Sequence, residues 1–476
     1  MNNLLIGVSK YIFAILMAFF VFMGYLVMPD RKTEKTALIR LQSVFMYLFH
    51  FIAYIIIFLN EKNSKVIIFY GMQLTMLILV RGIYSIIYDK NYSKGLMNNM
   101  CMLLCIGFVI LNRLYPSRAV KQFIIVCVAA VIALVIPFII QKSKNIPCLS
   151  YAYAIAGILF LLAVLVMGQL TYGANISISI AGFSFQPSEF VKILFVFFLA
   201  SFLRKETDFK HIFISAIFAG AHVLILVFSR DLGSALIFFM VYVAMVYVAT
   251  GKARYFFAGL GGFVLASIAS YFLFSHIRVR VQAFVDPWSV IDNAGYQVAQ
   301  SLFAIGTGGF MGLGLYRGLP KSVPLVDQDF IFSAICEELG GFFDICLVLL
   351  CISCFMYFIK SALKQKDMFY KLLGLGFSIT YAVQTILTIG GAIKFIPSTG
   401  VTLPLVSYGG SSVLCTMIIF AVLQGLFVVS SKEEQKLEDE RRKEREVIEA
   451  AITAGISISE QIENSDKSSK GNKNGK

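Results

Sequence analysis

The sequence predicts an all-α, polytopic membrane protein, and three observations lead to that fold class. Hydrophobic residues make up 58% of the 476 residues and charged residues only 14%, against roughly 25% in ordinary soluble domains. The mean hydropathy is +0.81. Apolar runs long enough to cross a ~30 Å hydrocarbon core recur along most of the chain. These features exclude a soluble globular protein and a disordered one.

The apolar runs predict about thirteen transmembrane helices. Their approximate ranges are 9–29, 43–59, 65–88, 97–112, 120–141, 151–168, 187–203, 211–229, 232–250, 255–275, 330–360, 370–393 and 411–430. A charged tail follows, 431–476, and its Ser-, Asn-, Lys- and Gly-rich end from 464 onward is expected to be disordered.

The distribution of basic residues predicts the orientation. The net charge is +14, and the loops at one end of the spans, together with the tail, hold the larger share of Lys and Arg. The positive-inside rule places that end in the cytoplasm, so the amino terminus is expected outside. Three long loops then face outward, at about 168–186, 276–328 and 394–410, and long loops in a compact architecture are usually functional. Because there is no soluble basic domain, we expect lipid contact and no nucleic-acid partner.

The cysteines and histidines predict no metal centre and no disulfide framework. Nearly all nine cysteines lie in apolar runs, where they suit packing. The C-x-x-C of Cys351 and Cys354 lacks the strand–helix setting of a redox motif. The four histidines show no metal-ligand spacing.

Ionisable groups at membrane depth are costly and therefore functional candidates. Glu189 and Lys192 open the span 187–203, behind Pro187, which suits a first helical turn. Their i,i+3 spacing puts them on one helix face, where they can pair. Two interpretations stay open, a structural ion pair between helices and a site that lines an outward cavity.

Asp329 lies where the largest outer loop meets the membrane. A carboxylate at that boundary could cap the helix 330–360, or act as a general base with a raised pKa. Asp327 adds a second carboxylate, whose repulsion would raise the pKa of Asp329 further. Glu337 and Glu338 lie deeper and must face other helices or water.

Further charged groups gather on the outer side. Asp231, after the span 211–229, reads as a helix cap. The outer cations suit either lipid headgroups or an anionic substrate such as a pyrophosphate; they are Arg278, Arg280, Arg317, Lys321 and Lys394.

Two glycine-bearing segments break the helical pattern. Residues 306–314 match no nucleotide-binding motif. Residues 400–412, which include Ser407, Gly409 and Gly410, are expected to be non-helical backbone that lines a cavity or is buried in protein.

Six segments, in order, resemble motifs of the SEDS (FtsW/RodA/SpoVE) family of bacterial cell-wall proteins. They are FQPSEFVKI (185–193), RDLGSALIFF (230–239), RVRVQAFVDPWS (278–289), AGYQVAQSLFAIGTGGFMGLGL (294–315), DFIFSAICEELG (329–340) and IPSTGVTLPLVSYGGSS (396–412). The resemblance covers about 97–430 and implies a ten-helix core with the large loop 276–328. The region 1–96, with about three spans, resembles nothing in the family.

The resemblance implies a peptidoglycan glycosyltransferase in the bacterial cytoplasmic membrane. Such an enzyme polymerises lipid II on the outer face, releases undecaprenyl pyrophosphate, and works with a class B penicillin-binding transpeptidase in cell division, cell shape or sporulation. Asp329 would be the catalytic residue and Glu189 with Lys192 a functional pair. The further expected substrate contacts are Arg278, Arg280, Asp231, Lys394, Ser407, Gly409 and Gly410.

We expect Asp329 to take a proton from the acceptor sugar as it attacks the donor. Lys192, Arg278, Arg280 and Lys394 are the expected cations for the leaving pyrophosphate. The sequence identifies no cofactor, and a divalent ion (Mg²⁺ or Mn²⁺) at the pyrophosphate is left open. A lipid II flippase and a non-catalytic scaffold for the transpeptidase remain the alternatives.

Overall fold

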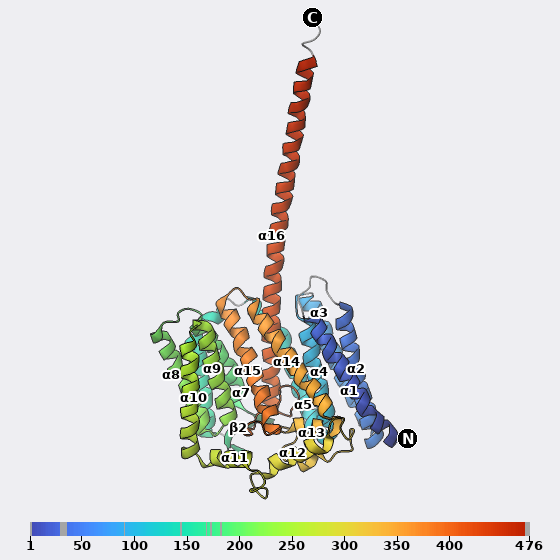
Figure 1. Cartoon of the computed structure of the whole chain (residues 1–476), viewed down its shortest axis with the longest axis vertical. Helices are drawn as coiled ribbons and strands as arrows, with labels where there is room; N and C mark the ends of the chain where they lie inside the picture. Colours follow the sequence, from blue (N-terminus) through green and yellow to red (C-terminus); the bar gives the residue numbers. More distant parts are fainter. Residues whose placement is uncertain are drawn as a thin grey trace.

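The computed structural model describes residues 2–28, 36–89, 91–142, 145–167, 169–171, 174–180 and 183–471. Long helices stand side by side in one slab, one helix projects far beyond it, and short elements gather at the opposite end (Figure 1). The all-α membrane class is therefore confirmed.

The N-terminal region forms three helices: α1 (Asn2–Val27), α2 (Thr36–Glu61) and α3 (Ser64–Tyr88). The long helices of the remaining bundle are α4 (Lys94–Leu114), α5 (Pro116–Lys142), α6 (Ser150–Met167), α7 (Pro187–Leu203), α8 (Phe209–Phe228), α9 (Leu232–Thr250), α10 (Ala253–Leu273), α14 (Gly341–Leu363), α15 (Met368–Ala392) and α16 (Gly410–Gly471). A 3₁₀ turn, η1 (Ile146–Cys148), precedes α6.

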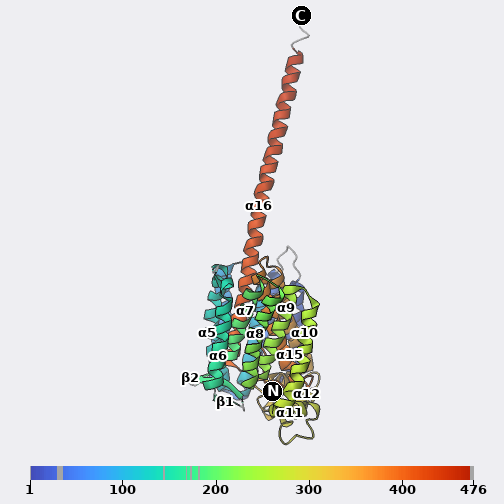
Figure 2. The same cartoon turned by 90° about the vertical axis from the view of Figure 1, so that its left-hand side faces the viewer.

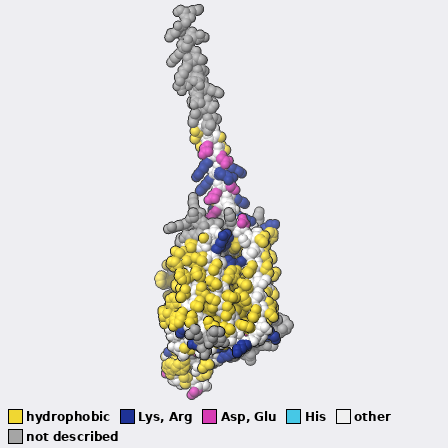
Figure 3. Space-filling model, turned by 90° about the vertical axis from the view of Figure 1, so that its right-hand side faces the viewer, with side chains coloured by type: hydrophobic (Ala, Val, Ile, Leu, Met, Phe, Trp, Pro, Cys, Tyr) yellow, Lys and Arg dark blue, Asp and Glu magenta, His cyan; other side chains and the backbone are white. Residues whose placement is uncertain are grey.

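Eleven helices in the described part of the chain are long and apolar enough to cross a membrane. The helices α6 and α7, at two of the other predicted spans, are shorter, so a total of thirteen stays a prediction. An apolar belt covers the face of the slab in Figure 3, and basic side chains gather at its two ends. Such a belt is what a bilayer requires of a protein surface.

The predicted span 330–360 is wrong as a single helix. The chain forms α13 (Ile331–Leu339), breaks at Gly340, and continues as α14. Gly340 has a φ of +92°, a conformation that only glycine adopts at low cost. The physical reason is that Glu337 and Glu338 cannot face lipid, so the membrane-crossing helix begins after them.

Two of the expected long loops contain regular structure. Between α6 and α7, the described residues form a three-stranded antiparallel ribbon, β1 (Gln169–Thr171), β2 (Ala174–Ile180) and β3 (Phe183–Phe185), in the order β1-β2-β3. β1 pairs Leu170 with Asn175, and β2 pairs Ser179 with Ser184. The loop 276–328 contains most of α11 (Ser275–Val285), α12 (Tyr296–Gly308) and a 3₁₀ turn, η2 (Pro320–Ser322).

The two ends of the slab differ in what they carry. The start of α1, the strand β2 and the helices α11 to α13 lie at one end, and the free part of α16 leaves from the other (Figures 1 and 2). The long loops and the charged tail therefore lie at opposite ends of the slab, as predicted. The assignment of the loop end to the outside stays a prediction. α16 continues to Gly471, so helix replaces the disorder expected for 464–471, and 472–476 lie outside the described residues.

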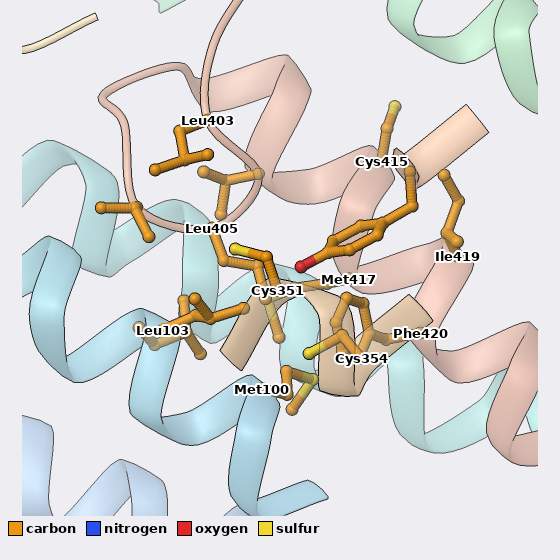
Figure 4. Packing of buried hydrophobic residues seen from close by; sticks show 14 of the residues in the cluster. Met100, Leu103, Cys351, Cys354, Leu403, Leu405, Cys415, Met417, Ile419 and Phe420 are labelled. Atoms are coloured by element: carbon orange, nitrogen blue, oxygen red, sulfur yellow. The ribbon is translucent and has the colours of Figure 1, made fainter. Parts of the chain in front are cut away.

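Cysteines serve as packing residues, as predicted. All nine are free, and seven are buried. Cys351 and Cys354 of α14 pack among Met100 and Leu103 of α4 (Figure 4). Leu403 and Leu405 point into the same cluster from the segment before α16. This non-helical segment is therefore anchored by its own apolar side chains.

Candidate active site

A cavity of about 570 Å³ opens at the end of the slab away from the tail. Its walls come from the α8–α9 turn, α11, α12, the segment before α13, and residues 391–412. Six of the predicted site residues line it: Asp231, Arg280, Asp329, Lys394, Gly409 and Gly410. Ile125 of α5 and Gln186 also line it, so the cavity brings together residues from 125 to 412 of the chain.

Asp329 lies in the cavity wall, immediately before α13. Of its two possible roles, the structure does not support the cap, because the N-cap position is Phe330, which makes no side-chain cap hydrogen bond. The residue is partly exposed, while its carboxyl group lies deep enough for burial to raise its pKa to about 6. Its own backbone N–H and Arg280 lower this pKa, and Asp327 adds to the rise. A carboxylate tuned in this way can accept a proton near neutral pH.

Asp327 has a different environment from Asp329. It is buried, forms an ion pair with Arg118, and its carbonyl accepts a hydrogen bond from Tyr408 N at 2.7 Å. The expected repulsion on Asp329 has the predicted direction, but burial is the larger cause. Asp327 therefore anchors the wall.

Two of the expected cations face the cavity. Arg280 donates through Nη1 to the carbonyl of Ser398 at 3.1 Å, and both Asp329 and Asp231 act electrostatically on its guanidinium. Lys394, with a φ of +56°, also lines the cavity. Arg230, beside Asp231, also lines the cavity. The cavity can thus stabilise an anion next to the Asp329 carboxyl.

Asp231 is the predicted helix cap and also part of the cavity wall. Its Oδ1 accepts a hydrogen bond from Ser234 N at 3.1 Å, which caps α9. Its Oδ2 accepts bonds from Ser188 Oγ and Ser234 Oγ, both at 2.8 Å, and from Gln186 Nε2 at 3.2 Å. With this set of donors the carboxylate holds the starts of α7 and α9 together.

Ser407 does not line the cavity but fixes the segment that does. It is buried, donates to the carbonyl of Gln328 at 2.5 Å, and accepts from Leu403 N. Gln122 of α5 donates to the Ser407 carbonyl and accepts from Gly409 N. Gly107 of α4 permits this approach, because a Cβ there would lie 2.8 Å from the carbonyl oxygen of Val406.

Glu189 and Lys192 form a buried ion pair behind the cavity wall. The Lys192 ammonium lies 2.6 Å from Glu189 Oε2 and 2.8 Å from Gln384 Oε1. Gln384 in turn donates to the carbonyl of Thr402, and Thr402 lines the cavity. Of the two interpretations, the structure supports the ion pair. Neither residue lines the cavity, so Lys192 is not placed to contact a leaving group directly.

Arg278 is exposed and also lies outside the cavity wall. Glu337 and Glu338, the two carboxylates of α13, do not line the cavity and bind neighbouring segments. Glu338 pairs with Arg113 at 3.0 Å, and Glu337 accepts from Leu319 N at 2.8 Å.

The carboxylates of the cavity do not make a metal site on their own. The Asp231 oxygens are occupied by hydrogen-bond donors, which leaves the Asp329 carboxyl. Within the described chain, the one cluster of three possible ligands is Glu206 and Asp208, between α7 and α8, with His211 in the first turn of α8.

Several functional positions are neutral polar residues that the sequence did not single out. Gln122, Gln297, Gln384 and Tyr408 line or hold the cavity. Gln122 and Gln384 sit inside predicted spans, and a search for uncharged polar groups at membrane depth would have found them.

A helical membrane bundle with a charged cavity at one end defines an integral membrane protein with a polar site at the bilayer surface. The family model of the cell cycle proteins FtsW, RodA and SpoVE matches residues 96–432, and the chain belongs to this family. It is a multi-pass protein of the bacterial membrane.

Named relatives and solved structures agree with this assignment. The peptidoglycan glycosyltransferase RodA of Mycobacterium bovis is 34% identical, over 67% of this chain and 74% of that protein. The probable peptidoglycan glycosyltransferase FtsW of Buchnera aphidicola is 31% identical, over 79% and 98%. A solved chain from a peptidoglycan synthase complex that coordinates polymerization and crosslinking has a TM-score of 0.60 and 26% identity, covering 72% of this chain and 98% of that one. The rod shape determining protein RodA of Thermus thermophilus, at a TM-score of 0.55 and 24% identity over 71% and 96%, supports the fold.

Proposed function

We propose that the protein is a peptidoglycan glycosyltransferase that polymerises lipid II in the cavity around Asp329. The observation that carries the proposal is the Asp329 carboxyl, with a pKa raised by burial to about 6, in one cavity with Arg280 and Lys394. The relatives named glycosyltransferases support the class of reaction.

Asp329 acts as the general base. As the acceptor sugar's 4-hydroxyl oxygen attacks the anomeric carbon of the donor, its proton passes to the Asp329 carboxylate. The new C–O bond forms while the bond from the anomeric carbon to the pyrophosphate oxygen breaks. One carboxylate suffices, since the leaving group needs no protonation, unlike that of a glycosidase.

Arg280 and Lys394 stabilise the negative charge that develops on the polyprenyl pyrophosphate as it leaves. Arg230 adds a third cation to the lining of the cavity. Two lipid-anchored substrates held in one cavity would gain much of the rate from alignment. Glu189 and Lys192 act indirectly, by supporting Thr402 through Gln384.

The cavity opens to the outer side of the membrane, where lipid II is consumed. The end opposite the tail carries the cavity, and the basic residues of the tail end support a cytoplasmic position for it. A penicillin-binding transpeptidase is the partner that the solved peptidoglycan synthase complex supports.

Purified protein in detergent with lipid II as the sole substrate tests the proposal. Without a sealed membrane, a flippase gives no product, and a scaffold gives none without its partner enzyme. The enzyme yields glycan strands that a muramidase digests. Absence of strands, with and without a class B penicillin-binding protein, contradicts the proposal.

A further inference from the structure

The helices α1 to α3 lie outside the family match, which begins at residue 96, yet they are joined to the core by polar contacts at membrane depth. Asn98 Nδ2 of α4 donates to Gln42 Oε1 of α2 at 2.8 Å, and Ser43 contacts Asn98 at 3.3 Å. Arg81 of α3 donates to Ser43 at 2.6 Å. Such groups are costly to leave unpaired in lipid, so these helices are a fixed part of the bundle.

The outer ends of α1 and α2 reach one segment of the large loop, Gly309–Leu319, which we name the clamp loop. Lys10 Nζ of α1 donates to the carbonyl of Gly312 at 2.9 Å. The hydroxyl of Tyr316 donates to Glu61 Oε1, at the end of α2, at 2.6 Å. Gly314 packs so closely on Ile6 that a Cβ there would lie 3.2 Å from the Ile6 carbonyl oxygen.

The helix α13 holds the other side of the clamp loop. Tyr316 N donates to Glu338 Oε1 at 3.0 Å, and Gly314 N donates to the Glu338 carbonyl at 2.8 Å. Arg113 of α4 pairs with Glu338 and lies over the Tyr316 ring, 4.3 Å from its centroid. Tyr316 is therefore the junction between α2, α4 and α13.

The backbone of Tyr316 supports this role. Its φ of +72° is uncommon for a residue other than glycine and costs free energy unless contacts hold it. Its hydroxyl, its ring and its N–H all have partners, and each partner belongs to a different helix. The helix α13, which Tyr316 contacts through Glu338, begins two residues after Asp329.

We propose that α1 and α2 are a built-in positioning element that holds the clamp loop against α13 and so orients the segment carrying Asp329, with Tyr316 and Glu61 as the positioning residues. The effect on catalysis rests on the proposed function, whereas the coupling of α1 and α2 to α13 through the clamp loop does not depend on it.

Hydrogen exchange on the full chain tests the coupling without any assay of activity. In Tyr316→Phe and in Glu61→Leu, which removes the acceptor, amides of 309–319 and 329–339 should exchange about tenfold faster, because a charge-assisted hydrogen bond is lost. Tyr25→Phe is the matched control. It also removes one hydroxyl contact between the N-terminal helices and the core, to Leu349 of α14 at 3.0 Å, and should leave both segments unchanged. Unchanged exchange in Tyr316→Phe, or equal acceleration by Tyr25→Phe, overturns the proposal.

A kinetic measurement tests the consequence for Asp329. Tyr316→Phe should lower kcat about tenfold and leave KM for lipid II within about twofold, because the cavity wall keeps its residues. The double variant Glu61→Leu/Tyr316→Phe should be no slower than Tyr316→Phe alone, since each substitution removes the same hydrogen bond. Additive losses, or a rise in KM with an unchanged kcat, contradict the positioning role. If Asp329→Asn retains activity, the proposed function fails, while the exchange result still decides the coupling.

Discussion

Asp327 and Asp329 are two residues apart and have different environments. Asp327 forms an ion pair with Arg118, whereas Asp329 faces the cavity, where burial raises its pKa. Sequence reasoning found both carboxylates but could not separate them, because the partner Arg118 lies 209 positions away along the chain. Only the fold decides which carboxylate is paired.

The raised pKa of Asp329 predicts the pH dependence of the rate. The base is active when deprotonated, so with a pKa of about 6 kcat/KM should be constant above pH 7 and fall about tenfold per pH unit below 6. At pH 5 about one-tenth of the plateau should remain, while an ordinary aspartate of pKa ~4 would keep nearly all of it. Initial rates of lipid II polymerisation between pH 4.5 and 8 measure this, with recovery at pH 7.5 as the control for unfolding. A flat profile down to pH 5 contradicts the raised pKa.

The buried pair of Glu189 and Lys192 makes a prediction about stability. Glu189→Gln leaves an unpaired ammonium that is 3% exposed, and breaking a buried pair on one side costs about 3–5 kcal/mol. The thermal midpoint in detergent should therefore fall clearly. In Glu189→Gln/Lys192→Met the charge is gone, and most of the lost midpoint should return. A double variant as unstable as the single one would show that the pair does more than neutralise charge.

At the scale of elements, hydropathy predicted where apolar helices lie but not where the chain bends near the cavity. The run 330–360 looked continuous, because α13 and α14 are both apolar on their buried faces. The break depends on Gly340, whose φ of +92° is a property of the folded backbone. The close approach of the segment before α16 to Gly107 likewise depends on a neighbour distant in sequence.

Gly340→Ala tests the break between α13 and α14. A Cβ there would lie 2.4 Å from the backbone nitrogen of Gly312, and the positive φ is unfavourable for alanine. We expect a loss of more than about 1 kcal/mol, seen as a lower thermal midpoint and lower yield. Gly261→Ala in α10 is the matched control, since nothing lies within 4 Å of its Cβ position; its midpoint should not fall. Equal behaviour of the two variants would contradict a strained break.

At the scale of the whole molecule, the orientation in the membrane follows from the charge of the loops and can be tested with a native cysteine. Cys148 is exposed, and it lies near the tail end, where Lys432 of α16 donates to Gln141 of α5 at 2.7 Å. A membrane-impermeant maleimide should label Cys148 only after cells are permeabilised. In a Cys148→Ser background, Lys321→Cys should be labelled in intact cells. The reverse pattern would place the cavity in the cytoplasm and contradict the proposed reaction.

The family and the helical membrane class of the core were predictable because its motifs resemble a known family, and the N-terminal helices were predictable only as apolar runs. Their contacts with the clamp loop could not be foreseen, since Glu61 and Tyr316 are ordinary residues in sequence and meet only in the fold. The helices α1 to α3 thus join the part of the molecule that carries the proposed base.

The most direct measurement compares the purified full-length protein with Asp329→Asn in the polymerisation of labelled lipid II, resolved by strand length on a gel. Asp286→Asn, in the loop 276–328 that precedes Asp329 and exposed, serves as the matched control. The wild type and the control should form glycan strands, and Asp329→Asn should form none while keeping its thermal midpoint. Strands of normal yield from Asp329→Asn would contradict the account.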